Sequence, residues 1–395
     1  MKPRILLIIE GTYPWYRGGV SEWVYQYLLG LSDYHFHILQ VATDEFLQLD
    51  PYQALYPIPD NVRSFSRVHP PKFEQSWQYE KDAWFASVAP NLSNLSFELI
   101  HVTNTGFAGW LGSEISKIRQ IPLVLTEHAL YWKEVEKGAV ALECGFKIEG
   151  SVIGKHQIME DFKEIASEVY EQAETVVSVS KININEQKAL GAKSPVYIPN
   201  GISTDLIEKE IQLNNDPVIG WVGRCAEMKN PLRFFDLVDD FRKQATHSHP
   251  QFIMMLSDAN EKKLQQEVIQ RGKCYDEVEL IWNTSAIEHM SRMDALVITS
   301  HNESQPLVMF EALAKNALPF GWEVGDVTNA FAITVDSSTS DAELVQKIDH
   351  VITNPNILKE LIAERKVTLM ESHTWEIIFE EYDQLFSTIG SVISQ

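Results

Sequence analysis

The most informative stretch of the chain is SHNESQPLVMFEA, from Ser300 to Ala312. The apolar run Ala295–Thr299 stands directly before it and is typical of a buried β-strand. Pro306 then indicates a helix start, because proline is common at the first helical position. Glu303 is therefore predicted in a strand-to-helix loop, and Glu311 near the second turn of the helix. In parallel sheets such loops lie at the carboxyl ends of the strands, where ligands bind.

The residue types of this stretch suit a ligand with hydroxyl and phosphate groups. Carboxylates accept hydrogen bonds from sugar and ribose hydroxyls, and the N–H groups of a helix start attract an anion. We therefore expect the loop and helix to bind a ligand through Glu303, Ser304, Gln305, Pro306 and Glu311. Taken alone, the two acids are equally consistent with a solvated loop and the exposed side of an amphipathic helix.

A second candidate lies upstream, after the apolar strand Pro217–Val222. We expect a turn at Gly223 and then a helix over Pro231–Arg242. A glycine turn lets the backbone approach a phosphate, and the cations Arg224 and Lys229 can hold a diphosphate. On its own this signal is weak, because a lysine after a strand is more often simply solvated.

The first half of the chain has two further candidates after strands. Gly18 and Gly19 precede a predicted helix, where a glycine pair permits close approach by a ligand; the alternative is a plain tight turn. His128 follows the strand Leu123–Thr126 and is expected to point toward the same ligand crevice, although a lone histidine is more often structural. The G-x-G-x-x-G fingerprint of dinucleotide binding does not occur at the glycine pair.

Apolar runs alternate with amphipathic segments along the whole chain, which is the pattern of βαβ units. We therefore predict an α/β protein with two Rossmann-like domains, whose parallel sheets face each other across a cleft. The segment Asp44–Pro90 breaks the rhythm and receives no assignment. The predicted strands are Arg4–Ile9, His35–Ala42, Leu99–Val102, Leu123–Thr126, Val176–Val179, Val196–Ile198, Pro217–Val222, Phe252–Ser257, Val278–Trp282 and Ala295–Thr299. The predicted helices are Val20–Leu31, Ala108–Arg119, Asp161–Ala173, Pro231–Arg242, Glu261–Arg271 and Leu307–Lys315.

The polar run Ser203–Asp216 reads as an interdomain linker. It places an N-terminal domain at residues 1–203 and a C-terminal domain at residues 204–372. Residues 373–395 form a separate final helix, because apolar residues recur at helical spacing from Trp375 onward.

Composition excludes several classes of protein. The chain has 33 Lys plus Arg against 55 Asp plus Glu, a formal net charge of −22, so nucleic acid is not expected as a partner. Its three cysteines stand singly, and no segment has the length of a secretory h-region or a membrane span, so we expect a cytoplasmic protein. There is no Asp-x-Asp, P-loop, His-Glu-x-x-His or Gly-x-Ser-x-Gly motif. We therefore predict neither a metal site nor a cofactor.

Taken together and in this order, these residues resemble the retaining GT-B glycosyltransferases of family 4. The resemblance covers nearly the whole chain, and its most specific marks are Val222-Gly223-Arg224 with Lys229, and Glu303 with Glu311 eight residues later. The runs Gly18–Val24 and Thr126–Tyr131 are similar to the branch that contains the Pel-polysaccharide glycosyltransferase.

The resemblance implies a role for each matched residue. Arg224 and Lys229 would bind the donor diphosphate, Glu311 the ribose and Glu303 the donor sugar. His128 would lie near the reacting sugar. In the same way, Gly19 would lie by the phosphates, and the helix containing Trp375 would cross back to the first domain.

The implied activity is transfer of a sugar from a nucleotide sugar, by the family branch a UDP-sugar, to a glycan or glycolipid acceptor. The anomeric configuration would be retained, and no metal would be used. The reaction would belong to surface polysaccharide synthesis, and the protein would associate peripherally with a membrane synthase. Two alternatives stay open: a catalytically silent sugar-nucleotide-binding subunit of such a synthase, and a GT-B-like sugar-nucleotide epimerase.

The chain departs from the family pattern at two places. Ser304 stands where the family has glycine, and a serine there can crowd the approach to the sugar. The helix end reads Asn316-Ala317-Leu318-Pro319 in place of Gly-x-Pro. Asparagine tolerates the left-handed conformation, so Asn316 is expected to end the helix as glycine would.

Overall fold

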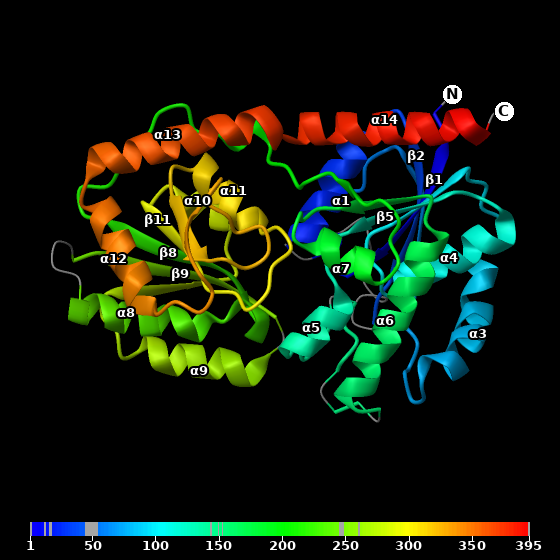
Figure 1. Cartoon of the computed structure of the whole chain (residues 1–395), viewed down its shortest axis with the longest axis horizontal. Helices are drawn as coiled ribbons and strands as arrows, with labels where there is room; N and C mark the ends of the chain where they lie inside the picture. The colour runs from blue at the N-terminus through cyan, green and yellow to red at the C-terminus, as the bar shows by residue number, and fades with distance from the viewer. Residues whose placement is uncertain are drawn as a thin grey trace. The chain divides into compact units, whose positions relative to one another are not determined.

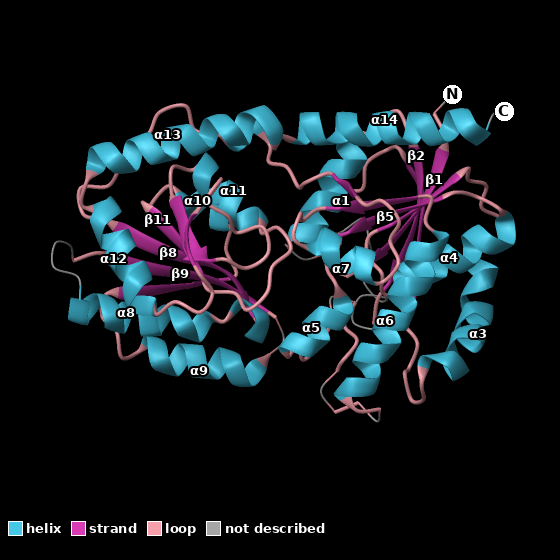
Figure 2. Ribbon diagram, viewed as in Figure 1, coloured by secondary structure: helices cyan, strands magenta, loops and turns pink. Residues whose placement is uncertain are grey.

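The computed structural model describes residues 2–11, 13–15, 18–43, 54–142, 144–148, 150–151, 153–244, 249–259 and 261–393. The chain forms two compact units (Figure 1). The N-terminal unit comprises Met1–Asn200 with Trp375–Gln395, and the C-terminal unit comprises Gly201–Thr374. In each unit helices surround a sheet (Figure 2).

The N-terminal unit is built on a seven-stranded sheet with the order β3-β2-β1-β4-β5-β6-β7 among the described residues. Every neighbouring pair is parallel. The order reverses between β1 and β4, which makes the carboxyl ends of these strands the expected ligand edge. The strands are β1 (Arg4–Glu10), β2 (His35–Val41), β3 (Val62–Val68), β4 (Leu99–Val102), β5 (Leu123–Glu127), β6 (Thr175–Ser178) and β7 (Val196–Tyr197).

Helices cover this sheet, and the last helix of the chain is one of them. Tyr382 and Phe379 of that helix, α14, pack on Tyr27 of α1, with ring centroids 5.7 and 6.0 Å from the Tyr27 ring. Figure 1 shows α14 in red beside the blue α1. The helical segments are α1 (Gly19–Gly30), α3 (Trp77–Val88), η2 (Ala89–Leu92), α4 (Phe107–Arg119), α5 (Tyr131–Lys137), α6 (Lys155–Gln172), α7 (Asn183–Ala189) and α14 (Trp375–Ile393).

The C-terminal unit has a six-stranded parallel sheet with the order β10-β9-β8-β11-β12-β13 in the described part of the chain. Its order reverses between β8 and β11, so the carboxyl ends of these two strands meet. The strands are β8 (Val218–Cys225), β9 (Gln251–Asp258), β10 (Val278–Trp282), β11 (Ala295–Ile298), β12 (Leu318–Trp322) and β13 (Ile333–Val335). The helical segments are η3 (Thr204–Leu206), η4 (Glu227–Lys229), α8 (Pro231–Gln244), α9 (Lys262–Gly272), α10 (Ala286–Met290), α11 (Leu307–Ala314), α12 (Asp341–Ile352) and α13 (Pro355–Ser372).

The predicted architecture of two Rossmann-like parallel-sheet domains is confirmed. No element was predicted where β3 and α3 lie, inside the segment Asp44–Pro90; residues 44–53 of that segment fall outside the described residues. β3 is an edge strand whose middle residues are half-buried, so Arg63, Ser64 and Ser66 replace an apolar run. β12, β13, α12 and α13 also went unassigned, whereas the final helix, α14, was predicted.

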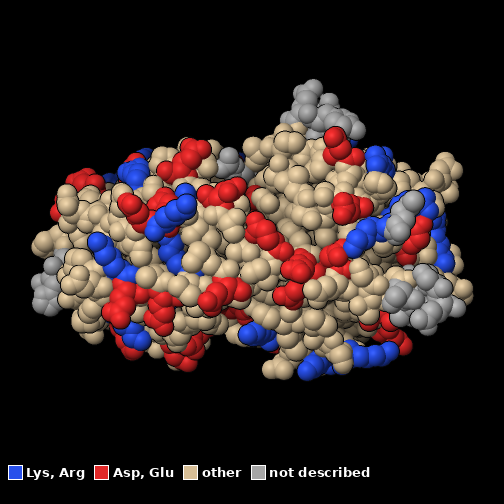
Figure 3. Space-filling view, turned by 90° about the horizontal axis from the view of Figure 1, so that it is seen from above, with Lys and Arg blue, Asp and Glu red and all other residues tan. Residues whose placement is uncertain are grey.

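Charged side chains of both signs are interspersed on the face drawn in Figure 3, and acidic groups recur across it. None of the described helices combines the length and apolarity that a bilayer crossing requires.

Candidate functional site

The site in the C-terminal unit begins where two adjacent strands end. β8 is followed by the short helix η4, which carries Lys229, and β11 is followed by the loop that carries Glu303. Because β8 and β11 are paired, these side chains meet: Lys229 Nζ lies 2.6 Å from Glu303 Oε1. The predicted residues Lys229 and Glu303 are therefore brought together, although they stand 74 positions apart.

Hydrogen bonds hold the loop and the residue before it against η4 and β8. Thr299 Oγ1 lies within donating distance of Lys229 O at 2.9 Å and of Asn230 O at 2.8 Å, and Trp221 Nε1 of β8 donates to Thr299 Oγ1 at 2.8 Å. The backbone N–H of His301 donates to Met228 O at 2.9 Å. The strand end, the loop and η4 thus hold one another, which limits the motion of Lys229 and of the loop together.

The Lys229–Glu303 ion pair is partly withdrawn from water. The Glu303 side chain is 9% exposed and that of Lys229 is 27% exposed. Ser300 Oγ also donates to Glu303 Oε1, at 2.6 Å. Because the medium is less polar than bulk water, this pair attracts more strongly than an exposed one. The arrangement presents a lysine and a carboxylate, each able to bind a polar ligand, at the edge where ligands of parallel sheets bind.

The loop runs on into α11, as predicted from Pro306, which is the residue before the first helical position. Glu311 lies half-buried within this helix. Behind the loop stands Gly325, whose backbone has a positive φ of 54°. A Cβ at Gly325 would lie 1.8 Å from Glu303 O, so the loop fits only against glycine. Sequence reasoning missed Gly325, because its role depends on a contact with a loop far from it in the sequence.

Two further bonds hold the same loop from the side of β12. Asp326 N donates to Ser304 O at 2.8 Å, and Gln305 Nε2 donates to Asp326 Oδ2 at 3.2 Å. Gln305 and Pro306 are buried, so their side chains support the loop rather than facing solvent.

The predicted turn at Gly223 is wrong. Gly223 and Arg224 are inside β8, paired with Leu256 and Ser257 of β9, and the strand continues to Cys225. The chain turns only at Ala226, which precedes η4. β8 is longer than expected because β9 offers pairing partners as far as Asp258. This pairing is between strands distant in the sequence, so the sequence around Gly223 does not show it. Arg224 is half-buried at this strand end.

In the N-terminal unit, Gly19 is the first residue of α1 and Gly18 precedes it, in the predicted order. Their neighbours Tyr16 and Arg17 lie outside the described residues. Gly18 has an extended backbone with φ 176°, which any residue adopts. Its carbonyl accepts the first helical bond, from Glu22 N at 2.9 Å.

His128 directly follows β5 and is 8% exposed. Its ring lies against Trp23 of α1, with a centroid distance of 4.5 Å and an edge-to-face geometry. Burial lowers the pKa of His128 to about 3, so the imidazole is neutral at pH 7. His128 Nε2 is buried and has no hydrogen-bond partner among the described residues. A buried polar atom of this kind calls for a functional explanation or a water.

Glu127, the last residue of β5, was not among the predicted site residues. It is fully buried, and burial raises its pKa to about 7. One carboxylate oxygen accepts from Thr105 N and Thr105 Oγ1, both at 2.9 Å, and the other accepts from Tyr170 OH at 2.5 Å. Glu127 therefore fixes the loop after β4 beside His128, and nothing in its local sequence distinguishes it from an ordinary strand-end acid.

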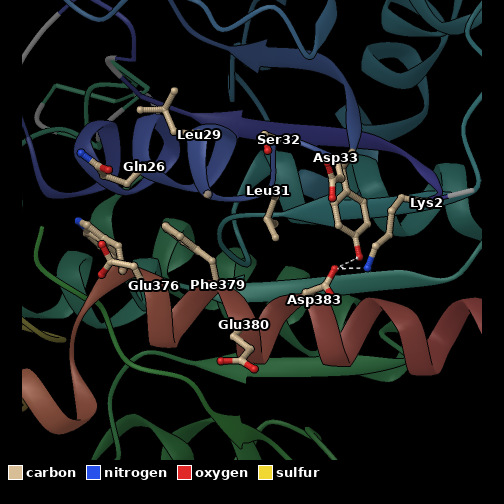
Figure 4. Close-up of a pocket in the computed structure, with 13 residues that line it drawn as sticks. Lys2, Gln26, Leu29, Leu31, Ser32, Asp33, Glu376, Phe379, Glu380 and Asp383 are labelled. Atoms are coloured by element: carbon tan, nitrogen blue, oxygen red, sulfur yellow. Dashed lines mark hydrogen bonds and ion pairs between the residues drawn. The ribbon is translucent and has the colours of Figure 1, made fainter. Parts of the chain in front are cut away.

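A cavity of about 580 Å³ in the N-terminal unit lies between α1 and α14 (Figure 4), and His128 is not among its lining residues. Its residues Lys2 and Asp33 precede β1 and β2, so it is at the amino ends of these strands. Asp383 of α14 accepts there from Tyr34 OH at 2.8 Å and pairs with Lys2. These contacts fasten α14 to the start of the chain.

The two parallel-sheet units, each with a reversed strand order, define the GT-B fold. Residues 203–367 match the family described as glycosyl transferases group 1, and residues 3–89 and 88–195 match a domain of unknown function, DUF3492. Together with the fold, the first of these matches supports a GT-B glycosyltransferase. No curated protein matches the chain.

Solved structures of the same fold align with this chain over almost its whole length and over almost the whole of their own. The Anabaena protein Alr3699/HepE in complex with UDP and glucose is 16% identical, with a TM-score of 0.73 and coverage of 98% of this chain and 99% of its own. Sucrose-phosphate synthase from Thermosynechococcus elongatus is 16% identical, with a TM-score of 0.75 and coverage of 98% and 100%. At this identity the similarity establishes the fold and not the substrates.

Proposed function

We propose that this chain is a cytoplasmic glycosyltransferase that moves a sugar from a UDP-sugar to a glycan or glycolipid acceptor in surface polysaccharide synthesis. The anomeric configuration would be retained, and no metal would take part. The observation that carries the proposal is the ion pair of Lys229 with Glu303 at the meeting ends of β8 and β11, in the unit that matches the glycosyltransferase family.

The donor diphosphate would be bound by cations of the C-terminal unit. Lys229 is fixed at the end of β8, and Arg224 is half-buried in the same strand end. As the bond from the sugar to the phosphate breaks, negative charge grows on the departing diphosphate, and fixed cations stabilise it. Glu303 would accept hydrogen bonds from the donor sugar, and Glu311 from the ribose.

His128 would contact the sugar from the N-terminal unit. Its neutral ring and its buried Nε2, which has no partner among the described residues, suit a hydrogen bond with a hydroxyl better than with a phosphate, because a neutral imidazole carries no charge to attract an anion. The acceptor glycan would be presented by a membrane synthase with which the chain would associate peripherally. A hydroxyl of the acceptor would form the new bond to the anomeric carbon, and its proton would pass to the diphosphate, which leaves with both electrons of the broken bond.

The choice of UDP is supported by HepE, which has been solved with UDP and with UDP-glucose. The fold alone does not select the base, because starch synthase IV of Arabidopsis thaliana, with a TM-score of 0.64, was solved with ADP and acarbose. The identity of the nucleotide base in the donor is therefore a question for the binding experiment below.

The test is the thermal stability of the protein with UDP, GDP, ADP and their common sugar conjugates, with Lys229→Ala alongside. A ligand at about a hundredfold excess over its Kd stabilises the native state by roughly 2.7 kcal/mol, which gives a measurable rise in Tm. We expect UDP and one UDP-sugar to raise Tm in the wild type and much less in the variant. No rise with any nucleotide contradicts the proposal.

Product analysis then separates the alternatives. Conversion of the UDP-sugar without an acceptor would identify an epimerase. Binding without turnover, together with co-purification of a membrane synthase, would identify a silent subunit.

A further inference from the structure

Trp23 of α1 is the centre of an aromatic cluster in the N-terminal unit. It is fully buried. Its ring stacks on Tyr27 at 4.6 Å and meets His128 edge to face at 4.5 Å. Rings of His101 and Tyr382 lie 5.9 Å away. Trp23 therefore fixes one side of the His128 ring.

Most polar atoms of this cluster are paired in one continuous chain. Tyr27 OH is hydrogen-bonded to His101 Nδ1 at 2.6 Å, and His101 Nε2 to Thr126 Oγ1 at 2.8 Å. Thr126 Oγ1 is in turn bonded to Tyr382 OH of α14 at 2.9 Å. This chain of hydrogen bonds ties α1, β4, β5 and α14 together beside the Trp23 ring.

Two atoms of the cluster stand outside this chain. Trp23 Nε1 and His128 Nε2 are both buried, and neither has a hydrogen-bond partner among the described residues. Their rings are in contact. Buried N–H groups are nearly always paired, and an unpaired one is unfavourable. Two such atoms on touching rings indicate that a polar group from outside the chain completes the arrangement.

The chemistry of the two rings selects that group. An indole N–H only donates, whereas a neutral imidazole offers one donor and one acceptor nitrogen. A hydroxyl can accept from the indole and donate to the imidazole at the same time. Phosphate and carboxylate oxygens only accept, so they could take the indole N–H but could not donate to the acceptor nitrogen of the imidazole.

We propose that Trp23 is a ligand-contacting residue, whose indole N–H binds a sugar hydroxyl jointly with His128. The inference rests on the proposed function and deepens it, since it adds a residue that recognises the carbohydrate. The hydroxyl comes from the donor sugar or from the acceptor, and the experiment distinguishes these sources.

The test compares Trp23→Phe with Trp77→Phe. Trp77 is a matched control: it is fully buried in the same unit, its Nε1 is also unpartnered, and its ring packs on Trp110 at 4.8 Å. Both substitutions remove one indole N–H and keep an aromatic ring. The Trp23 signal in the indole ¹⁵N–¹H spectrum is assigned by its loss in Trp23→Phe.

We expect the Trp23 signal to move when UDP-glucose, or the UDP-hexose that most raises Tm, is added, and to stay in place with UDP alone. The preference for that UDP-hexose over UDP, as a ratio of Kd values, should fall roughly twofold to tenfold in Trp23→Phe, the range of one neutral hydrogen bond. It should stay unchanged in Trp77→Phe. If the acceptor supplies the hydroxyl, the signal moves only when free glucose or a gluco-oligosaccharide is added to the UDP-saturated protein.

A Trp23 signal that moves with none of these sugars overturns the inference, because the N–H then binds a water only. An equal loss of UDP and UDP-hexose affinity in Trp23→Phe also overturns it, because the residue would then act through the fold. Neither result touches the proposed function, which fails separately if the wild type binds no nucleotide. Should Trp23→Phe fold poorly, the Trp23 signal is assigned in the wild type by triple-resonance connection of the indole to its backbone, and its response to the sugars still decides.

Discussion

Truncation of Lys229 to alanine removes the ammonium that lies 2.6 Å from Glu303 Oε1. Glu303 keeps the hydrogen bond from Ser300, but its carboxylate is only 9% exposed and loses its counter-charge. A diphosphate that approaches this strand end then meets an uncompensated negative charge in place of a cation. Nucleotide affinity is therefore expected to fall for two reasons that act in the same direction.

The lost interaction is a charge-assisted hydrogen bond, which contributes roughly 1.5–3 kcal/mol. The Kd for UDP should accordingly rise about tenfold to 150-fold in Lys229→Ala. Stability should also fall, by roughly 1–3 kcal/mol, because the mostly buried Glu303 carboxylate is left without its counter-charge. Loss of UDP binding in a protein that still folds is thus the signature of this residue.

Isothermal titration with UDP measures the effect. Lys262→Ala serves as the control, because Lys262 pairs with Asp258 in the same unit but is 62% exposed. The double variant Lys229→Ala/Glu303→Gln removes the stranded charge, so it should bind UDP more tightly than Lys229→Ala alone. A UDP affinity in folded Lys229→Ala equal to that of the control would refute the donor site.

Three further outcomes follow from the structure. His128→Ala should lower the transfer rate roughly threefold to tenfold while UDP affinity stays constant, because its unpartnered Nε2 offers one neutral hydrogen bond to the sugar; equal transfer by variant and wild type in a steady-state assay would remove His128 from the reaction. Glu127 has a folded pKa of about 7 against an ordinary 4.5, so the folded state holds the extra proton and loses stability as pH rises through that window. Glu127→Gln should therefore gain roughly 1–3 kcal/mol in urea unfolding at pH 8 and little at pH 4; a pH-independent difference speaks against it. Gly325→Ala should weaken UDP binding and destabilise by roughly 1–3 kcal/mol, because its Cβ would strike Glu303 O; Gly191→Ala, with a positive φ but open space, controls for backbone strain alone.

The sequence was sufficient for the fold because most strands are buried runs of apolar residues. Every residue of β1 after Arg4 is buried, and β11 is buried throughout, so both stand out as apolar runs. β3 escaped notice because an edge strand is half-exposed and tolerates polar residues. Gly223 misled because a glycine inside a strand and a glycine in a turn look the same without the pairing partner.

For the candidate site, the sequence could predict which residues end the strands but not which of them touch. The position of Glu303 in a strand-to-helix loop was predicted from the apolar run before it and from Pro306 after it. Its contact with Lys229 depends on the pairing of β8 with β11, two strands that are not consecutive in the chain. Trp23 and Glu127 could not be recognised, because in sequence a buried aromatic residue or strand-end acid looks like any core residue. Glu127 is set apart only by the hydrogen bonds that it accepts, and Trp23 only by an indole N–H that has no partner among the described residues.

The departure at Ser304 is accommodated by the surrounding structure. The loop does not require glycine at this position. Ser304 does not have a positive φ, so a side chain there causes no backbone strain. The close approach that the loop does require is made at Gly325, against Glu303 O, and the bond from Asp326 N to Ser304 O holds the backbone there. At the end of α11, Asn316 takes the left-handed conformation with φ 69°, as predicted. Its side chain also accepts from the buried Lys366 Nζ at 2.6 Å, a bond that glycine could not make. Both departures thus leave the Glu303 loop and its helix in place, which favours a working donor site over a vestigial one.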